Sequence, residues 1–459
     1  MAAKNSQKIT TSSTAEYFAK NLQQVGFSSP LKAVLTTLKE SLDNALDACE
    51  DYGILPEIKI LVEKAGEGTT RNTDKILIRV EDNGPGIDQK HVPMVFGQYL
   101  ASSKFGRGRC SRGQQGIGIS AATTWAVQTT ASGARITTKQ KGQKKALRCL
   151  VVTDIKKNKG ILKDKQMISW DKTSGTIVEF LIEGRIQMNG EGGLLNYIRS
   201  NILLNPHLSI TYQLPGIEPT FIERVTSTIP EVPQATDPHP HTMKLGEFMS
   251  YARQSPRIKP LDWLHRSFSR VSAAVANSIW KKSGLSTTLT KKTLGSFSTN
   301  QLTQLFTGIH EAKILAPSTQ SVMSIGEEAL SLSILRLGKI DYFSVVTRRP
   351  SICDFKPVQV EVAVARLKGS NQEADATVQV LRFANRVPLQ FDKSSCAISK
   401  AISSVTWKSY GLKQSKNSLP SGPYIIAVSI ISPFIKFKNA SKETIDASDE
   451  LVVDIRKAL

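Results

Sequence analysis

Three polar residues could activate a water molecule and bind a hard cation if they shared one face of a helix. Glu40, Asn44 and Asp47 are four and three residues apart within LKAVLTTLKESLDNALDACE (residues 31–50), which has helical apolar spacing. The Glu40 carboxylate could take a proton from water, and the Asn44 amide oxygen could bind Mg²⁺. A solvated charged face is the alternative, and the spacing alone leaves both open.

A carboxylate followed by a tight turn could recognise a flat ligand. Residues 57–62 and 75–81 are predicted strands, and Asp82 continues the inward phase of the second strand. The sequence Asn83-Gly84-Pro85-Gly86-Ile87 follows at once, and glycines there let the backbone approach a ligand closely. The Asp82 carboxylate is suited to accept a hydrogen bond from an exocyclic amine, as on adenine. An ordinary turn is the alternative.

A glycine-rich segment could hold phosphate. FGRGRCSRGQQGIGISAATTW (residues 105–125) carries five glycines and leads into a predicted helix from Ile119. Backbone N–H groups of such a loop at a helix N-terminus can bind phosphate oxygens. The segment lacks the closing GK[ST] of a P-loop and the spacing of a dinucleotide fingerprint. A surface loop is the alternative. Further on, Thr176 opens a predicted strand over 177–182 and could support Asp82 from a neighbouring strand.

Composition points to a large intracellular globular protein. The 459 residues suggest two to four domains, and 40% hydrophobic residues suffice for substantial cores. The net charge of +21 fits contact with a polyanion such as nucleic acid, although basicity can also serve solubility. Five scattered cysteines without a CxxC pair argue against zinc and disulfides. The sequence contains neither a signal peptide nor an apolar run of about 20 residues, so we expect no membrane partner.

The second half of the chain divides at a proline-rich boundary. IPEVPQATDPHPH (residues 229–241) precedes short predicted helices over 244–306, where basic residues alternate with aromatics. We expect the aromatics to form a small core, and whether the basic face contacts DNA stays open. Beyond residue 342, strands are predicted at 358–365, 376–383 and 424–431. Helices are predicted at 394–406 and 441–459.

The order of these blocks resembles the ATP-binding fold of gyrase, the Hsp90 chaperone, histidine kinases and MutL. The resemblance implies a Bergerat-type α/β sandwich within an α+β multidomain protein. Glu40 would be the general base, Asn44 the Mg²⁺ ligand, and Asp82 the residue that reads adenine. The full set that the resemblance assigns to ATP is Asn44, Asp82, Gly86, Ser103, Lys104, Gly113, Gln114, Gln115, Gly116, Ile117, Gly118, Ile119, Ser120, Thr176 and Lys442.

Several further blocks resemble one member of that superfamily, the B subunit of DNA topoisomerase VI. The sequence blocks are EYFAKNLQQVGF, FGQYLASSKFGRG, SRGQQGIGISAA, ILAPSTQSVMSIGEEAL and RFANRVPL, in the order of the family. The resemblance implies an N-terminal arm (1–15), an ATP-binding domain (16–228), a helix-two-turns-helix insert (229–308) and a transducer with split βαβ topology (309–459). Trp407, Lys408 and Tyr410 match a W-K-x-Y motif used against DNA. Lys442 matches a switch lysine that contacts the γ-phosphate.

The family's activity supplies the functional expectation. The chain would be the ATPase subunit of an A₂B₂ topoisomerase, dimerise through its ATP domain when ATP binds, and gate the passage of double-stranded DNA. The A subunit would cut, since no nucleophilic tyrosine with an acidic metal cluster is visible here. The chain stops at Leu459, whereas in the family a longer helix continues as a stalk towards the A subunit, so the resemblance does not extend to the element that couples the two subunits. A cytoplasmic, nucleoid-associated location is expected, or a nuclear one in a eukaryote.

Two rival functions stay open at this point. One is another ATPase of the superfamily, of the chaperone or mismatch-repair type, against which the helical insert and WKSY argue. The other is a non-catalytic, B-like DNA-binding scaffold. The presence of Glu40, Asn44, Asp82 and the glycine segment together argues against a scaffold.

Overall fold

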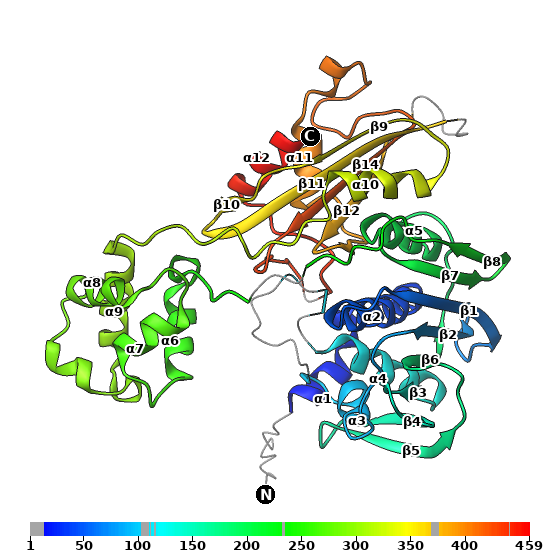
Figure 1. Ribbon diagram of the computed structural model, residues 1–459, viewed down its shortest axis with the longest axis horizontal. Helices are drawn as coiled ribbons and strands as arrows, with labels where there is room; N and C mark the ends of the chain where they lie inside the picture. Colours follow the sequence, from blue (N-terminus) through cyan, green and yellow to red (C-terminus); the bar gives the residue numbers. More distant parts are fainter. Residues whose placement is uncertain are drawn as a thin grey trace, which may run out of the picture.

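The protein contains two sheets and a separate helical insert (Figure 1). The computed structural model describes residues 13–101, 110, 112, 113, 116–231, 235–368, 376–439 and 441–459. Each sheet carries helices packed on it, and the insert stands to one side of both (Figure 1).

The N-terminal domain is built on a mixed eight-stranded sheet in the order β5-β4-β3-β6-β2-β1-β7-β8. Helices α2 and α4 pack on one another and on strands β2 and β6 at the centre of the sheet. Its helices are α1 (Thr14–Lys20), α2 (Pro30–Asp51), α3 (Val92–Gly97), α4 (Gly118–Thr130) and α5 (Leu194–Leu204). Its strands are β1 (Glu57–Glu67), β2 (Asp74–Asp82), β3 (Ala134–Lys139), β4 (Ala146–Asp154), β5 (Lys159–Ile168), β6 (Gly175–Gly184), β7 (Ser209–Leu214) and β8 (Ile217–Ile222).

Helix α2 forms because its N-terminal signals and its apolar stripe agree. The Ser29 side chain caps the helix by accepting a hydrogen bond from the Lys32 N–H, and Pro30 occupies the first turn. The stripe predicted from the sequence, with Leu38, Leu42 and their helical neighbours, is fully buried against the sheet. The polar edge of the helix, which carries Glu40 and Asn44, is thereby held in a fixed position at the centre of the domain.

The insert has its own core and a charged exterior. Its helices are α6 (Leu245–Arg253), α7 (Pro260–Ser267), α8 (Ala273–Lys282) and α9 (Thr299–Glu311). Phe248, Trp263, Phe268 and Trp280 are buried together, as expected for a small bundle. Nine basic side chains are exposed around this core: Arg253, Arg257, Lys259, Arg266, Arg270, Lys281, Lys282, Lys291 and Lys292.

The C-terminal domain is a six-stranded sheet with helices on both faces (Figure 1). Helices α11 and α12 pack together on one face, and α10 lies between the other face and α5 of the N-terminal domain. Its helices are α10 (Glu327–Ile334), α11 (Ala397–Ser404) and α12 (Asp449–Ala458). Its strands are β9 (Ile340–Thr347), β10 (Ser351–Cys353), β11 (Lys356–Leu367), β12 (Gln379–Ala384), β13 (Val387–Pro388) and β14 (Tyr424–Ile431).

Two details of this domain differ from the expectation. Strands β12 and β14 are parallel neighbours, with no strand between them, so this βαβ unit is contiguous rather than split. The helix expected over 441–459 begins only at Asp449, because Ser448 caps it by accepting a hydrogen bond from the Leu451 N–H. Residues 441–447 are therefore free to form a loop that reaches the N-terminal domain.

Candidate functional site

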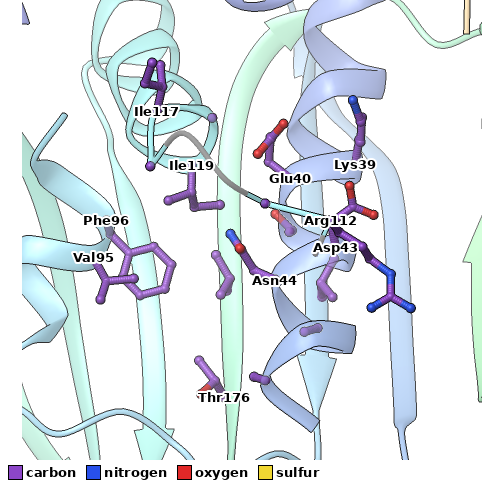
Figure 2. A pocket seen from close by; sticks show the side chains of 18 of the residues that line it. Lys39, Glu40, Asp43, Asn44, Val95, Phe96, Arg112, Ile117, Ile119 and Thr176 are labelled. Atoms are coloured by element: carbon purple, nitrogen blue, oxygen red, sulfur yellow. The ribbon is translucent and has the colours of Figure 1, made fainter. Parts of the chain in front are cut away.

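A cavity of about 1020 Å³ lies against the polar edge of α2. Glu40 and Asn44 from α2, Asp82 from β2 and Thr176 from β6 all line it. The start of α4, residues 116–119, closes one side, and Lys442 from the C-terminal domain reaches it from another. Figure 2 shows Glu40 and Asn44 projecting from α2 toward the side where Ile119 of α4 lies.

Glu40 and Asn44 both line the cavity, whereas Asp47 does not. Glu40 sits so close to Gly118 that a Cβ at that position would lie 1.9 Å from the Glu40 carboxylate oxygen Oε2. Only glycine therefore allows the N-terminus of α4 to approach this carboxylate. Asp47 is buried and accepts a hydrogen bond from Arg112, so it belongs to the packing behind the cavity rather than to its wall.

Asp82 lines the cavity at the end of β2, as the inward phase of the strand predicts. Its Oδ1 atom accepts hydrogen bonds from the N–H groups of Gly84 (2.8 Å) and Thr176 (3.2 Å). Within the described residues its Oδ2 atom has no protein partner, and the side chain lines the cavity. Burial raises the pKa of Asp82 to about 7, although the two backbone hydrogen bonds act to lower that pKa.

The turn after Asp82 depends on a glycine. Gly86 has φ +73°, and a Cβ there would lie 2.1 Å from the carbonyl oxygen of Lys139. The hydroxyl of Thr138 accepts a hydrogen bond from the Ile87 N–H (2.8 Å) and contacts the Thr176 hydroxyl at 3.1 Å. Strands β3 and β6 therefore hold the turn against the cavity, and Thr176 supports Asp82 as expected.

Lys442 reaches the N-terminal domain from the 441–447 loop. Its ammonium Nζ donates a hydrogen bond to the backbone oxygen of Arg112, at 3.1 Å. Burial lowers the pKa of Lys442, and the neighbouring cation Lys39 lowers it further. The residue adopts φ +56°, a left-handed conformation that non-glycine residues rarely take. Lys442 thus lies at the cavity, and its contact with a γ-phosphate stays a prediction.

The remaining predicted ligands divide into three groups. Gly113, Gly116, Ile117, Gly118 and Ile119 line the cavity. Ser120 does not line it, because its hydroxyl donates to the carbonyl of Gln98 (2.8 Å) inside the domain. Ser103, Lys104, Gln114 and Gln115 lie outside the described residues.

The WKSY segment forms a 3₁₀ turn, η6 (Trp407–Tyr410), on the C-terminal domain. Trp407 is buried in the core there, and its indole N–H donates to the carbonyl of Ile402 at 2.7 Å. This tryptophan anchors the turn, so its side chain is not presented to a DNA surface. Lys408 and Tyr410 are exposed beside it, and their DNA contact stays a prediction.

A buried ionic cluster behind the cavity was not foreseen from the sequence. Glu50, at the end of α2, binds both Arg112 and Arg386. These three residues come from three distant parts of the chain. Each looks in the sequence like one charged residue among many. The only local signal is RFANRVPL, whose Asn385-Arg386 pair is a two-residue turn between two short apolar runs.

Two family models match the chain. Residues 31–155 match the "Histidine kinase-, DNA gyrase B-, and HSP90-like ATPase" family, and residues 317–459 match the "Topoisomerase VI B subunit, transducer" family. The first match covers α2, the Asp82 turn and the start of α4. The second covers the C-terminal domain, which includes the loop with Lys442 and the turn with Arg386. The ATPase fold and the transducer expected from the sequence are thereby confirmed.

Curated relatives match along the whole chain. The B subunit of type 2 DNA topoisomerase 6 from Archaeoglobus fulgidus is 35% identical over 447 residues, which are 97% of this chain and 72% of the relative. That of Methanococcoides burtonii is 34% identical over 457 residues, 100% of this chain and 71% of the relative. This chain belongs to the family of type 2 DNA topoisomerase 6 B subunits.

Membership makes the chain an ATPase subunit of an ATP-dependent DNA topoisomerase. The segment that matches the ATPase family carries much of the lining of the cavity on α2. Among solved structures, the ATPase region of Saccharomyces cerevisiae topoisomerase II is similar, with a TM-score of 0.47 and 12% identity over 98% of this chain and 97% of that one. No helix in the described part of the chain is long and apolar enough to cross a membrane.

Proposed function

We propose that this subunit is an ATP-gated clamp for double-stranded DNA that works with a DNA-cleaving A subunit in an A₂B₂ assembly. The observation that carries the proposal is the cavity that both domains line, with Glu40 on one wall and Lys442 on another. A nucleotide in that cavity would touch the ATP-binding domain and the transducer at once. Its hydrolysis would therefore change a contact between two domains.

In this proposal Asp82 and the Gly86 turn hold the adenine, while the glycine segment before α4 holds the phosphates. The Oδ2 atom of Asp82 accepts a hydrogen bond from the exocyclic amine. The first N–H groups of α4, which have no partner within the helix, face the phosphate end of the cavity near Gly118. The residues at the two ends thus match the two ends of ATP in chemistry.

Glu40 is the residue we assign to water activation. Phosphoryl transfer needs mainly positioning and charge neutralisation, with one group to orient the attacking water. Glu40 is partly exposed in the cavity and lies beside Gly118, at the phosphate end. A carboxylate there can accept a proton from the water as its oxygen attacks the terminal phosphate.

The residues present fit a magnesium ion held mainly by the nucleotide. No group of three or more His, Cys, Asp or Glu side chains in the described ranges is arranged to hold a metal. Mg²⁺ commonly takes one or two protein oxygens and completes its shell with phosphates and waters. The Asn44 amide, exposed in the cavity one turn after Glu40, would supply such an oxygen. The ion would neutralise phosphate charge.

Lys442 would sense the terminal phosphate. Its position over the Arg112 backbone leaves its ammonium at the rim of the cavity, where a γ-phosphate would offer a stronger partner than a carbonyl. Loss of that phosphate would return the lysine to the carbonyl. Two such subunits, joined through their ATP domains with the N-terminal arms exchanged, would open and close around a transported duplex.

Replacement of Glu40 by alanine tests the assignment. We expect kcat for ATP hydrolysis to fall by about 10²–10⁴-fold, as is typical for loss of a general base. Binding of a fluorescent ATP analogue should be largely unchanged, because the adenine and phosphate contacts remain. Glu63→Ala, which removes an exposed glutamate from β1, is the matched control and should keep full turnover.

The outcomes separate the proposal from its rivals. Loss of nucleotide binding in Glu40→Ala would contradict a role limited to water activation. Equal turnover in Glu40→Ala and the unaltered chain would mean that this cavity is not the catalytic site. No turnover in the unaltered chain, with DNA and magnesium present, would favour the non-catalytic scaffold.

A further inference from the structure

Glu50 lies where three parts of the molecule meet. It is at the C-terminal end of α2, the helix that carries Glu40 and Asn44, and its side chain is 6% exposed. Arg112, which lies in the glycine-rich segment next to Gly113 of the cavity wall, contacts it from one direction. Arg386, from the turn between β12 and β13 of the transducer, contacts it from another.

Both arginines bind this carboxylate with two nitrogens. The Nη1 and Nη2 atoms of Arg112 lie 2.8 Å from Oε2 and Oε1 of Glu50. The Nη1 and Nη2 atoms of Arg386 lie 3.0 and 2.6 Å from Oε1 and Oε2. Two parallel hydrogen bonds fix the plane of a guanidinium relative to a carboxylate, so each arginine is oriented as well as attracted.

Among the described residues, two carboxylates face two guanidiniums in this cluster. Asp47 is the second anion and accepts a 2.7 Å hydrogen bond from Arg112. His207 contacts Oε1 of Glu50 at 2.8 Å, and burial lowers its pKa, which keeps the ring neutral. Burial alone would raise the pKa of Glu50, but Arg112 and Arg386 hold it well below the ordinary value. Glu50 is therefore ionised at neutral pH.

The turn that carries Arg386 is rigid. Asn385 and Arg386 both have positive φ, at +48° and +66°, as in a type I′ hairpin turn. The Asn385 amide bonds the backbone of Ser432 twice, at 2.9 Å in each direction. Arg386 is thus held by the transducer sheet and cannot follow Glu50 if the two domains separate.

The transducer therefore contacts Arg112 both directly and indirectly. Lys442 binds the backbone oxygen of Arg112 directly, and Arg386 reaches the Arg112 guanidinium through the shared Glu50 and, more weakly, through the shared Asn205 side chain. Figure 2 shows Arg112 beside α2, next to Asp43 on the wall of the cavity. If Arg112 moves, its contacts with Lys442 and with Glu50 both change. If the transducer moves instead, Arg386 leaves Glu50, and Arg112 is then the one arginine of the two that still binds this carboxylate.

We propose that Glu50 and Arg386 are positioning residues for ATP hydrolysis. Together they make the position of Arg112, and with it the glycine segment at the phosphate end of the cavity, depend on how the transducer is docked. Thermodynamic linkage makes the dependence reciprocal, so nucleotide that binds at Gly113 and residues 116–118 also stabilises transducer docking. This inference rests on the proposed use of the cavity for ATP.

A second arginine between the same domains provides a control. Arg336, which follows α10, donates to the backbone oxygens of Leu208, Glu223 and Asn205 at 3.3, 3.1 and 3.1 Å, and to that of Ile202. In the described part of the chain it makes no hydrogen bond to Glu50, to α2 or to Arg112. It touches the cluster only through the backbone of Asn205, so its loss weakens docking of the transducer and leaves the paired hydrogen bonds to Glu50 in place.

Hydrogen exchange with mass spectrometry on the full chain tests the proposal, with and without the β,γ-imido analogue of ATP and Mg²⁺. In the unaltered chain we expect the analogue to slow exchange both at residues 112–118 and at the turn around Asn385. In Arg386→Gln the slowing should stay at 112–118 and be lost at the turn. In Arg336→Gln both effects should remain, even if the melting temperature falls.

Steady-state kinetics gives a second readout. We expect kcat of Arg386→Gln to fall by about tenfold, with little change in KM, because the residue acts on the arrangement of the glycine segment and not on the bound nucleotide. Arg336→Gln should keep both constants. A role in stability alone would lower the melting temperature of both variants and leave their kcat values equal.

Each outcome decides the matter. If Arg386→Gln retains the analogue-dependent slowing at its turn, or if Arg336→Gln loses it equally, the proposal is overturned. The proposal is also overturned if the analogue does not slow hydrogen exchange at the turn around Asn385 in the unaltered chain. Failure of the unaltered chain to bind the analogue would instead sink the proposed ATP function. Should Arg386→Gln fail to fold, Arg386→Lys keeps the charge without the paired nitrogens and should show the same loss in part.

Discussion

At the scale of single residues, Asp82 shows how a carboxylate is prepared for a ligand. Two backbone N–H groups hold Oδ1, while burial raises its pKa to about 7. A carboxylate accepts a hydrogen bond from an amine through a free lone pair, which protonation of Oδ2 removes. Recognition of the adenine amine should therefore depend on pH in the neutral range.

Nucleotide affinity should fall as the pH drops below the pKa of Asp82. The carboxylate is ionised above about pH 7 and protonated below it, so the binding constant should decrease by up to about tenfold for each pH unit below 7. Titration of a fluorescent ATP analogue from pH 5.5 to 8.5 measures the effect.

The Asp82→Asn variant isolates this contribution, because phosphate groups of the nucleotide titrate in the same range. The variant should bind more weakly at pH 8 and lack the part of the pH dependence that Asp82 supplies. Identical pH profiles for the two proteins would contradict a role for an ionised Asp82 in binding.

Sequence reasoning found the residues with a strong local signal. Asp82 follows an alternating strand and precedes a glycine turn, so its inward direction could be derived. Glu50, Arg112 and Arg386 gave no such signal, because a buried ion pair looks like two surface charges until the chain is folded. Asp47 shares its helix face with Asn44 only roughly, and packing against Arg112 decides its direction.

At the scale of elements, glycines determine how closely the segments around the cavity approach one another. Gly86 combines a positive φ with a backbone oxygen 2.1 Å from the position that a Cβ would take, whereas Gly142, in the β3–β4 turn, has φ +87° with nothing within 4 Å. Comparing alanine substitutions at Gly86 and Gly142 separates the cost of backbone strain from the cost of steric contact. Both positions have a positive φ that disfavours alanine, but only Gly86 is crowded.

Gly86→Ala should destabilise the ATP-binding domain more than Gly142→Ala. The left-handed conformation costs alanine about 1–2 kcal/mol at either position. At Gly86 the clash with Lys139 adds to this cost and displaces the turn, so nucleotide affinity should fall as well. Chemical denaturation and analogue binding measure the two effects. Equal losses of stability with unchanged affinity would show that the close approach is unimportant.

In the η6 turn, the buried Trp407 and the exposed Lys408 should have different roles. Trp407→Ala should lower the free energy of unfolding of the transducer by about 3–5 kcal/mol, because a buried aromatic side chain is lost. Lys408→Ala should leave stability unchanged but weaken duplex DNA binding and reduce its salt slope by about one. Unchanged DNA affinity in Lys408→Ala would remove this turn from the DNA surface.

Most elements were predictable, and their ends were less so. Strand β14 and helix α2 match the expected ranges closely, because apolar patterning and end signals agree there. The expected helix over 441–459 was wrong at its start. Its charged and polar residues are compatible with helix, and only the Ser448 cap and the contacts of Lys442 with another domain make residues 441–447 a loop.

At the scale of the whole molecule, charge and domain arrangement determine what the protein can bind. The chain carries a net charge of +21, and the nine exposed basic residues of the insert surround a core that needs none of them. Such side chains bind phosphate with release of counterions, which makes affinity fall as salt rises. The transducer is linked to the ATP-binding domain at the cavity through contacts such as those of Lys442 and Arg386.

The rate of ATP hydrolysis with and without duplex DNA, measured at several salt concentrations, tests the clamp most directly. We predict that DNA raises kcat at low salt and that this stimulation fades as salt increases, since phosphate contacts and the cavity are linked through the transducer. A rate that DNA does not change, at a salt concentration where DNA binding is demonstrated, would contradict the account.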